Sequence, residues 1–339
     1  KNHKATLSLV EEMLLQPRFD ENEFNLLKKA TISNIRQQQA NPNSVARNVY
    51  NKLIYGDDNI RSKNILGTLN SVSSITLDDV KLFYKNYFSP SVAKILAVGN
   101  IEKEKLVNSL KSMELNWKPV KVSIPVYNTP NKPSKSLVYF YDIPNSKQSI
   151  LQFGAPALSA TDSDYYPAYI MNYILGGGGF ASRLTQELRE GKGYTYGISS
   201  GFYGTKAKGS FTISSGVRSN VTLESASLIK TILTNYPNTF SKNDLDTSKS
   251  FLIKSNARAF ETAGSKLGIL SSISSYGLSS DYIRDREEIV QDMTVERIKE
   301  LANKYVNPEN MIWLVVGDAK TQFKRMEELG FGKPILLNK

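Results

Sequence analysis

Residues 175–203 read LGGGGFASRLTQELREGKGYTYGISSGFY, and this stretch is the most informative part of the chain. An apolar helical run ends in the four glycines 176–179, and an amphipathic segment that predicts a short helix follows at 181–190. The alternation from 194 to 203 predicts a strand. Arg189 therefore falls at a helix end, and Tyr196 falls near the start of the strand, seven residues later.

The glycine cluster, the Ser-Arg-Leu step at 182–184 and the Arg/Tyr spacing occur together. In this combination the segment closely resembles the substrate-clamping segment of the insulinase/pitrilysin family of zinc peptidases, of the mitochondrial-processing-peptidase type. The family pattern Leu-Arg-x6-Tyr matches Leu188, Arg189 and Tyr196. The resemblance implies that Arg189 orients a peptide backbone and that the Tyr196 phenol donates to the scissile carbonyl oxygen. The alternative is a helix-end charge and a strand aromatic in a core; Tyr194 ranks below Tyr196.

The glycine loop leaves two interpretations open. One is a flexible helix C-terminus in which Gly176 adopts the left-handed conformation. The other is a substrate-facing loop, whose expected binding residues are Gly178, Gly179, Phe180 and Ser182. A phosphate-binding loop is excluded, because that motif needs a preceding strand and a terminal Gly-Lys-Ser/Thr, whereas Phe180-Ala181 follows here.

A zinc site is not predicted in this chain. The family holds zinc with an H-x-x-E-H helix and a later Glu, but the chain has one histidine, His3, and no cysteine. We interpret His3 as a surface residue beside the first helix. The helix equivalent to the zinc helix, 165–175, lacks His and Glu, and the third-ligand position falls near Asn34, a poor zinc ligand. We therefore expect no metal here, and zinc in a catalytic partner half.

Composition limits the remaining classes. The 339 residues allow two domains, and no apolar run of 18 or more residues suggests a membrane span. The net charge of +11 comes from lysines interleaved with acids, without a basic run or a nucleic-acid motif, so we expect solvated surface rather than nucleic-acid binding. No signal peptide is visible. The compartment stays open, with cytoplasm and periplasm both compatible.

The chain contains an internal repeat. Residues 75–100 align without a gap with residues 293–318, at an offset of 294 − 76 = 218. In both copies Thr reads as a helix N-cap, Pro ends the helix, and an apolar strand run ends at Gly. The second copy is preceded by residues 137–292 and the first by only 74 residues, so we expect the first unit to be incomplete at its N-terminus.

These observations predict an α+β fold that consists of a duplicated insulinase-like unit, each a mostly antiparallel sheet covered by helices. The expected domains are residues 1–116, the C-terminal part of the first unit; 117–136, a Pro-rich linker whose start Trp117 fixes to the first unit; and 137–339, the complete second unit.

The leading hypothesis is the substrate-clamping, zinc-less half of an insulinase-like zinc endopeptidase, acting on peptides enclosed between paired halves. Its partner is a zinc-bearing half, from the same polypeptide or another subunit, and the chain alone is not expected to be active. The alternative is a structural homologue with no peptidase role.

Overall fold

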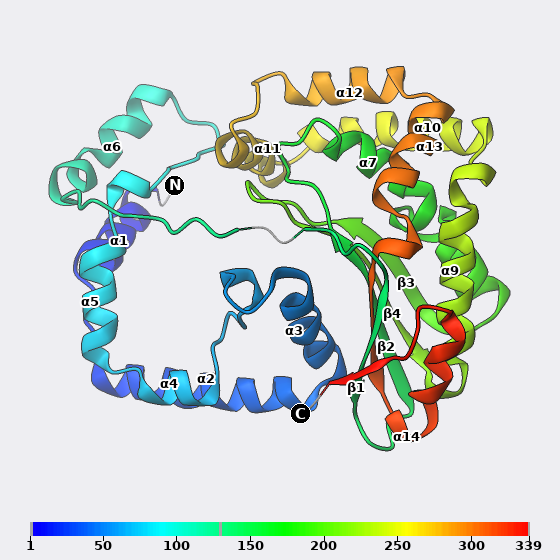
Figure 1. Ribbon diagram of the computed structural model, residues 1–339. Coiled ribbons are helices and arrows are strands. Elements are labelled where there is room, and N and C mark those ends of the chain that lie inside the picture. The colour runs from blue at the N-terminus through cyan, green and yellow to red at the C-terminus, as the bar shows by residue number, and fades with distance from the viewer. Residues whose placement is uncertain (1–2, 129–130, 338–339) are drawn as a thin grey trace. The chain divides into compact units, whose positions relative to one another are not determined.

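The computed structural model describes residues 3–128 and 131–337 (Figure 1). The described chain forms two compact units that interleave along the sequence. The first unit contains the chain up to Gln37, with Ile65–Val126 and Phe260–Ser271. The second contains Gln38–Asn64, Tyr127–Ala259 and the chain from Ser272 onward.

The second unit is built on a sheet of six strands in the order β3-β4-β2-β5-β1-β6. The pairs β3/β4, β4/β2 and β2/β5 are antiparallel, whereas β5/β1 and β1/β6 are parallel. The predicted α+β class with a mostly antiparallel sheet is therefore confirmed. The strands are β1 (Leu137–Asp142), β2 (Gln148–Pro156), β3 (Thr195–Phe202), β4 (Ser210–Arg218), β5 (Ile312–Gly317) and β6 (Ile335–Leu337).

Strand β5 explains why the sheet is covered on both faces. All six of its residues are buried, and alternate side chains of a strand point to opposite faces. Trp313 and Val315 enter one apolar core, while Leu314 and Val316 enter the other. An unbroken apolar run such as Ile-Trp-Leu-Val-Val is typical of a strand buried on both sides.

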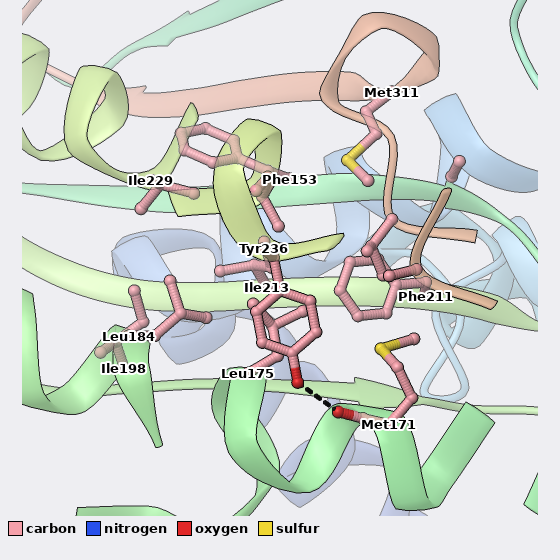
Figure 2. Packing of buried hydrophobic residues seen from close by; sticks show 14 of the residues in the cluster. Phe153, Met171, Leu175, Leu184, Ile198, Phe211, Ile213, Ile229, Tyr236 and Met311 are labelled. Carbon is pink, nitrogen blue, oxygen red and sulfur yellow. Dashed lines mark hydrogen bonds between the residues drawn. The ribbon is translucent and has the colours of Figure 1, made fainter. Parts of the chain in front are cut away.

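One face of the sheet carries most of the helices of this unit (Figure 1). Figure 2 shows part of their core, where Phe153 and Phe211 from the strands pack with Tyr236, whose hydroxyl donates to the Met171 carbonyl oxygen at 2.7 Å. Burial raises the pKa of Tyr236. The helices are α7 (Tyr165–Asn172), α8 (Arg183–Thr185), α9 (Thr222–Thr239), α10 (Lys242–Asn256), α12 (Tyr282–Asp292), α13 (Val295–Tyr305) and α14 (Ala319–Gln322).

The other face is covered by α3 (Pro42–Tyr55). Asn41 caps this helix by accepting from two backbone amides, and Pro42 occupies its first turn. Its buried residues Ala46, Tyr50 and Ile54 recur every four positions and pack against β2 and β5. The Tyr50 hydroxyl lies 3.5 Å from the Phe211 carbonyl oxygen, and burial raises the pKa of Tyr50.

The repeat is visible in the structure as two capped helices. Thr294 accepts from the Arg297 amide at the start of α13, and Thr76 accepts from the Asp79 amide at the start of α5 (Leu77–Tyr87), both at 3.1 Å. A 3₁₀ turn beginning at Pro90 or Pro308 follows each helix. The predicted N-caps are therefore confirmed.

The prediction of a strand after the first of these turns is wrong. Residues 93–98 form no strand, although the equivalent residues 311–316 contribute to β5. Strand β5 has a hydrogen-bonded neighbour on each side, and no part of the described chain pairs with 93–98 in this way. An apolar sequence alone does not make a strand, because the backbone groups need partners.

The described first unit is helical. Tyr84 of α5 donates to the Leu14 carbonyl oxygen at 2.7 Å, and Phe88 stacks between Tyr84 and Trp117. Trp117 thus fixes the start of the linker to the first unit, as the sequence predicted. The helices are α1 (His3–Leu15), α2 (Glu21–Ala40, within this unit as far as Gln37), α4 (Leu69–Ser74), α5, α6 (Lys103–Asn116) and most of α11 (Ala263–Tyr276).

No described helix combines the length and apolar composition needed to cross a membrane.

Candidate functional site

The glycine loop of the second unit begins with a wide helical turn. Helix α7 continues into a π-turn at Tyr173–Gly177, and such turns are frequent at functional sites. Asn172 holds this turn to β3, because its amide nitrogen donates to the Ser200 carbonyl oxygen at 2.8 Å and its amide oxygen accepts from the Ser200 hydroxyl at 2.5 Å. A Cβ at Gly176 would lie 2.2 Å from that hydroxyl oxygen and 2.8 Å from the Ser200 nitrogen, so only glycine allows this approach.

The left-handed position lies further along the loop than predicted. Gly176 is helical and buried, and Gly179 has φ 57°, so the prediction of Gly176 as the left-handed residue is wrong. The close contact between Gly176 and Ser200 fixes the first glycine in the helix. Gly178 is constrained differently: a Cβ there would lie 2.7 Å from the Tyr173 carbonyl oxygen and 3.0 Å from the Tyr173 ring.

The other two expected binding residues of the loop, Phe180 and Ser182, differ in exposure. Phe180 is 65% exposed, whereas Ser182 is fully buried. The Ser182 hydroxyl donates to the Gly179 carbonyl oxygen at 2.7 Å and lies 3.0 Å from the Thr185 hydroxyl. Ser182 therefore fixes the shape of the loop, and Phe180 presents its ring to solvent.

Arg189 lies in a second π-turn, Gln186–Gly191, that follows α8. Leu188 points into the core, and Arg189 points outward, where its guanidinium carbon lies 4.7 Å from the centre of the Phe180 ring. The Arg189 Nε lies 3.3 Å from a Glu190 carboxylate oxygen. Two of the residues expected at the site, Arg189 and Phe180, are thus in direct contact.

Tyr196 is turned outward by an irregularity in β3. Thr195 pairs with Val217 and Ile198 pairs with Ser215, so two residues of β3 face one residue of β4. This β-bulge exposes Tyr196 at 91%, although regular alternation would place it on the buried face of Ile198. The alternative of Tyr196 as a core aromatic therefore does not hold. Among the described residues its side chain has no hydrogen bond or ring contact, including any with Arg189.

Thr195 maintains the bulge. Its hydroxyl donates to the Gly216 carbonyl oxygen at 2.7 Å, accepts from the Gly197 amide at 3.0 Å and lies 3.0 Å from the Ser215 hydroxyl. A bulge can re-aim a side chain beside a site, and it depends on pairing with β4. The sequence pattern therefore gave no signal of it.

Arg183 anchors the segment to the helices behind it. Its guanidinium donates to the Asp244 carboxylate at 2.7 Å and to the Thr239 carbonyl oxygen at 2.8 Å, and it lies over the Tyr236 ring. The Arg of the Ser-Arg-Leu step is therefore a structural residue, with its donors directed into the protein.

The residues of this chain do not fit a zinc ion. The helical segment 165–175 carries Tyr, Pro, Ala, Ile, Met, Asn and Leu, none of which supplies the imidazole or carboxylate ligands of a catalytic zinc. Asn34 and His3 are exposed residues of α2 and α1. Within residues 3–128 and 131–337, no three His, Cys, Asp or Glu side chains are grouped to hold a metal.

Comparison with known proteins assigns the chain to a family. The family described as the peptidase M16 inactive domain matches residues 74–252, more than half of the chain. The chain belongs to the peptidase M16 family through this inactive domain, which confirms the insulinase/pitrilysin resemblance.

Three relatives illustrate the similarity. The "non-peptidase homolog YmxG" of Helicobacter pylori is 23% identical over 93% of this chain and 72% of its own length. The "uncharacterized zinc protease YmxG" of Bacillus subtilis is 25% identical over 77% of this chain and 62% of its own length. The crystal structure of a peptidase M16 inactive domain from Pseudomonas fluorescens superposes with a TM-score of 0.84 and 26% identity, over 93% of this chain and 75% of that one.

Proposed function

We propose that this chain is the substrate-clamping, zinc-less half of an M16 zinc metalloendopeptidase, which acts on peptides enclosed between paired halves. The exposure of Tyr196 is the observation that supports this most strongly. Its phenol is held out of the core by a bulge that three polar contacts of Thr195 stabilise. Core packing does not require an exposed Tyr196, whereas binding of a ligand by its phenol does.

Tyr196 serves as a hydrogen-bond donor. A phenol O–H aimed at a carbonyl oxygen stabilises the negative charge that develops there when the carbonyl is attacked. Removing one such donor typically costs about 2.7–4 kcal/mol of transition-state stabilisation. A chain without zinc can contribute decisively to hydrolysis in this way.

Arg189 orients the peptide. The Phe180 ring covers one part of the guanidinium, and Glu190 lies beside its Nε. The two terminal nitrogens form a planar fork that suits a backbone carbonyl or a carboxylate. Gly178 and Gly179 allow a peptide backbone to approach the loop, since neither carries a side chain, and Ser182 keeps the loop in shape.

Zinc belongs to the partner in this proposal. The residues here do not fit the metal, and the Bacillus subtilis relative is named a zinc protease. We infer that a zinc-bearing M16 half, in the same polypeptide or in another subunit, supplies the metal, and that this chain supplies binding and orientation.

A structural role is the second candidate, favoured by the name of the Helicobacter pylori relative, a non-peptidase homolog. A scaffold makes no use of an exposed Arg189 beside Phe180. The two candidates therefore differ in what happens to peptide binding when Arg189 is changed.

The test is fluorescence anisotropy of a labelled unstructured peptide with the full chain. Arg189→Gln should weaken binding about tenfold, since hydrogen bonds from a charged donor contribute about 1.5–3 kcal/mol. Lys192→Gln, an exposed charge three residues away, is the matched control and should bind like the wild type. Equal affinity of wild type and Arg189→Gln would favour the scaffold.

A further inference from the structure

An aromatic surface of the second unit combines Phe180 of the glycine loop with neighbouring rings that have no role in the site described above. Helix α7 carries Tyr166 and Tyr169, and Tyr173 begins the π-turn that continues it. The spacing of three and four residues places the three rings along one helical face. The Tyr166 and Tyr169 rings stack at 5.8 Å. Phe251 of α10 stacks on Tyr173 at 4.7 Å and extends the row. We call Tyr166, Tyr169, Tyr173, Phe251 and Phe180 the aromatic platform.

The glycine loop connects the platform to the Arg189 site. Tyr173 lies directly under the loop, because its ring is 3.0 Å from where a Gly178 Cβ would be and its carbonyl oxygen accepts from the Gly178 amide. Two residues further, Phe180 meets the Arg189 guanidinium at 4.7 Å. The loop thus has Tyr173, with Phe251 of α10 stacked on it, at its start and the Phe180–Arg189 contact at its end.

Its outer rings are exposed to an unusual degree for their size. Phe180 is 65% exposed, Phe251 50% and Tyr169 48%, whereas Tyr173, on which Phe251 stacks, is buried. Exposed aromatic groups that are rigid and clustered mark binding surfaces, since an aromatic ring gives a large contact area at a low cost in conformational entropy. Stacking on Tyr166 and Tyr173 supplies the rigidity here.

The size of the platform favours a peptide over a folded partner. Three rings of 150–250 Å² that are about half exposed offer roughly 300 Å². A stable protein interface buries about 800 Å² on each partner. One or two apolar side chains of an extended peptide would cover the platform, while a second folded copy would need much more surface than it provides.

We infer that the aromatic platform binds an aromatic or large aliphatic side chain of a peptide whose backbone lies at Arg189. This inference rests on the proposed function and adds the substrate class: unstructured peptides with a large apolar residue near the bound segment. The platform determines preference, and Arg189 and Tyr196 act on the backbone whatever the side chain.

The experiment uses the full chain and two fluorescein-labelled peptides of Gly, Ser, Thr and Asn, identical except for one central residue, Phe or Ser. The wild type should bind the Phe peptide at least tenfold more tightly, since burying such a side chain contributes about 1.5–3 kcal/mol. Phe251→Ser and Phe180→Ser should each reduce this ratio to about twofold or less. Phe251→Leu, which keeps an apolar side chain on Tyr173, should keep part of it.

Tyr203→Ser is the control. Tyr203 is 57% exposed and lies directly after β3, outside the platform. Its loss should leave the ratio of the two affinities unchanged. Circular dichroism and Tm of every variant establish that each is folded, and Phe251→Leu gives the decisive comparison if Phe251→Ser is unfolded.

The outcomes separate this inference from the proposed function. If both peptides bind with equal affinity and Arg189→Gln weakens the binding of both, the platform is contradicted and the proposed substrate-clamping role stands. A preference for the Phe peptide, with affinities for both peptides that Arg189→Gln leaves unchanged, supports the platform and contradicts the clamp. No binding of either peptide contradicts both. Concentration-dependent association of the chain that Phe251→Ser abolishes would assign the platform to a second copy and overturn the peptide.

Discussion

Tyr196 and Ile198 are two residues apart on β3, yet one is exposed and the other is buried in the core. In a regular strand they would share a face, so the bulge opposite Gly216 is what separates them. This relationship leaves the Tyr196 side chain exposed to solvent.

The bulge should depend on the Thr195 hydroxyl. Thr195→Val keeps the shape of the side chain and removes the bonds to the Gly216 carbonyl oxygen and the Gly197 amide. Because both bonds are only partly buried, their loss should lower the free energy of unfolding by about 0.5–1.5 kcal/mol. Urea unfolding measures this loss. The comparison is Thr212→Val, since Thr212 lies on the neighbouring strand and is only partly buried. An unchanged midpoint in Thr195→Val would show that the hydroxyl does not hold the bulge.

The first glycine of the loop should tolerate no side chain. A Cβ at Gly176 would lie 2.8 Å from the backbone nitrogen of Ser200, which cannot move without disturbing β3. We expect Gly176→Ala to destabilise the chain by about 1–3 kcal/mol through overpacking. Gly197→Ala is the control, because a Cβ there meets nothing within 4 Å, and it should stay within about 0.5 kcal/mol of the wild type. Similar stability of both variants would contradict the tight contact.

Acid should weaken the link between α7 and α13. Burial tends to raise the pKa of Asp164, but hydrogen bonds from Lys304 and Tyr305, together with the Arg297 charge, outweigh it and hold this pKa below its usual value. A lowered folded-state pKa means that the carboxylate stabilises the protein above the unfolded-state pKa of about 3.9 and that this contribution is lost as the pH falls through the folded value.

Asp164→Asn should therefore have a lower Tm than the wild type at pH 7. The difference in Tm between the two proteins should decrease as the pH falls below about 4. Thermal unfolding of both proteins between pH 2.5 and 7 makes the comparison. A difference in Tm that stays constant over this pH range would mean that the charge of Asp164 does not contribute to stability.

The purified chain should hold well under one zinc ion per molecule and should cleave no peptide. It has a single histidine and no cysteine, and 165–175 offers no ligand for a catalytic zinc. Metal analysis and a fluorogenic peptide assay check both points. One zinc per chain with turnover that a chelator abolishes would overturn the assignment as a zinc-less half.

Most elements of the second unit could be predicted from sequence. The alternation in β3 and β4 follows from the two-residue period of strand side chains, and the helix after Thr294 follows from the need to cap its first backbone amides. The helix over 42–55 shows the limit of prediction from local sequence. Its apolar residues recur every four positions, but that period does not say which sheet they cover, and the structure assigns this helix to the second unit.

The site shows the same limit. Its residues could be named because Arg189 and Tyr196 lie in one continuous segment that resembles a family motif. The bulge, the Asn172–Ser200 pair and the buried Ser182 hydroxyl depend on contacts between segments far apart in sequence. No periodicity within one segment contains that information.

Turnover of the Tyr196→Phe variant, assembled with its zinc-bearing half, tests the central claim most directly. The substitution removes one O–H from a side chain that is almost fully exposed and leaves the ring. The clamp predicts a fall in kcat of about 10²–10³ with an unchanged Tm. An unchanged kcat in a folded Tyr196→Phe assembly would contradict the clamp and leave the chain as a scaffold.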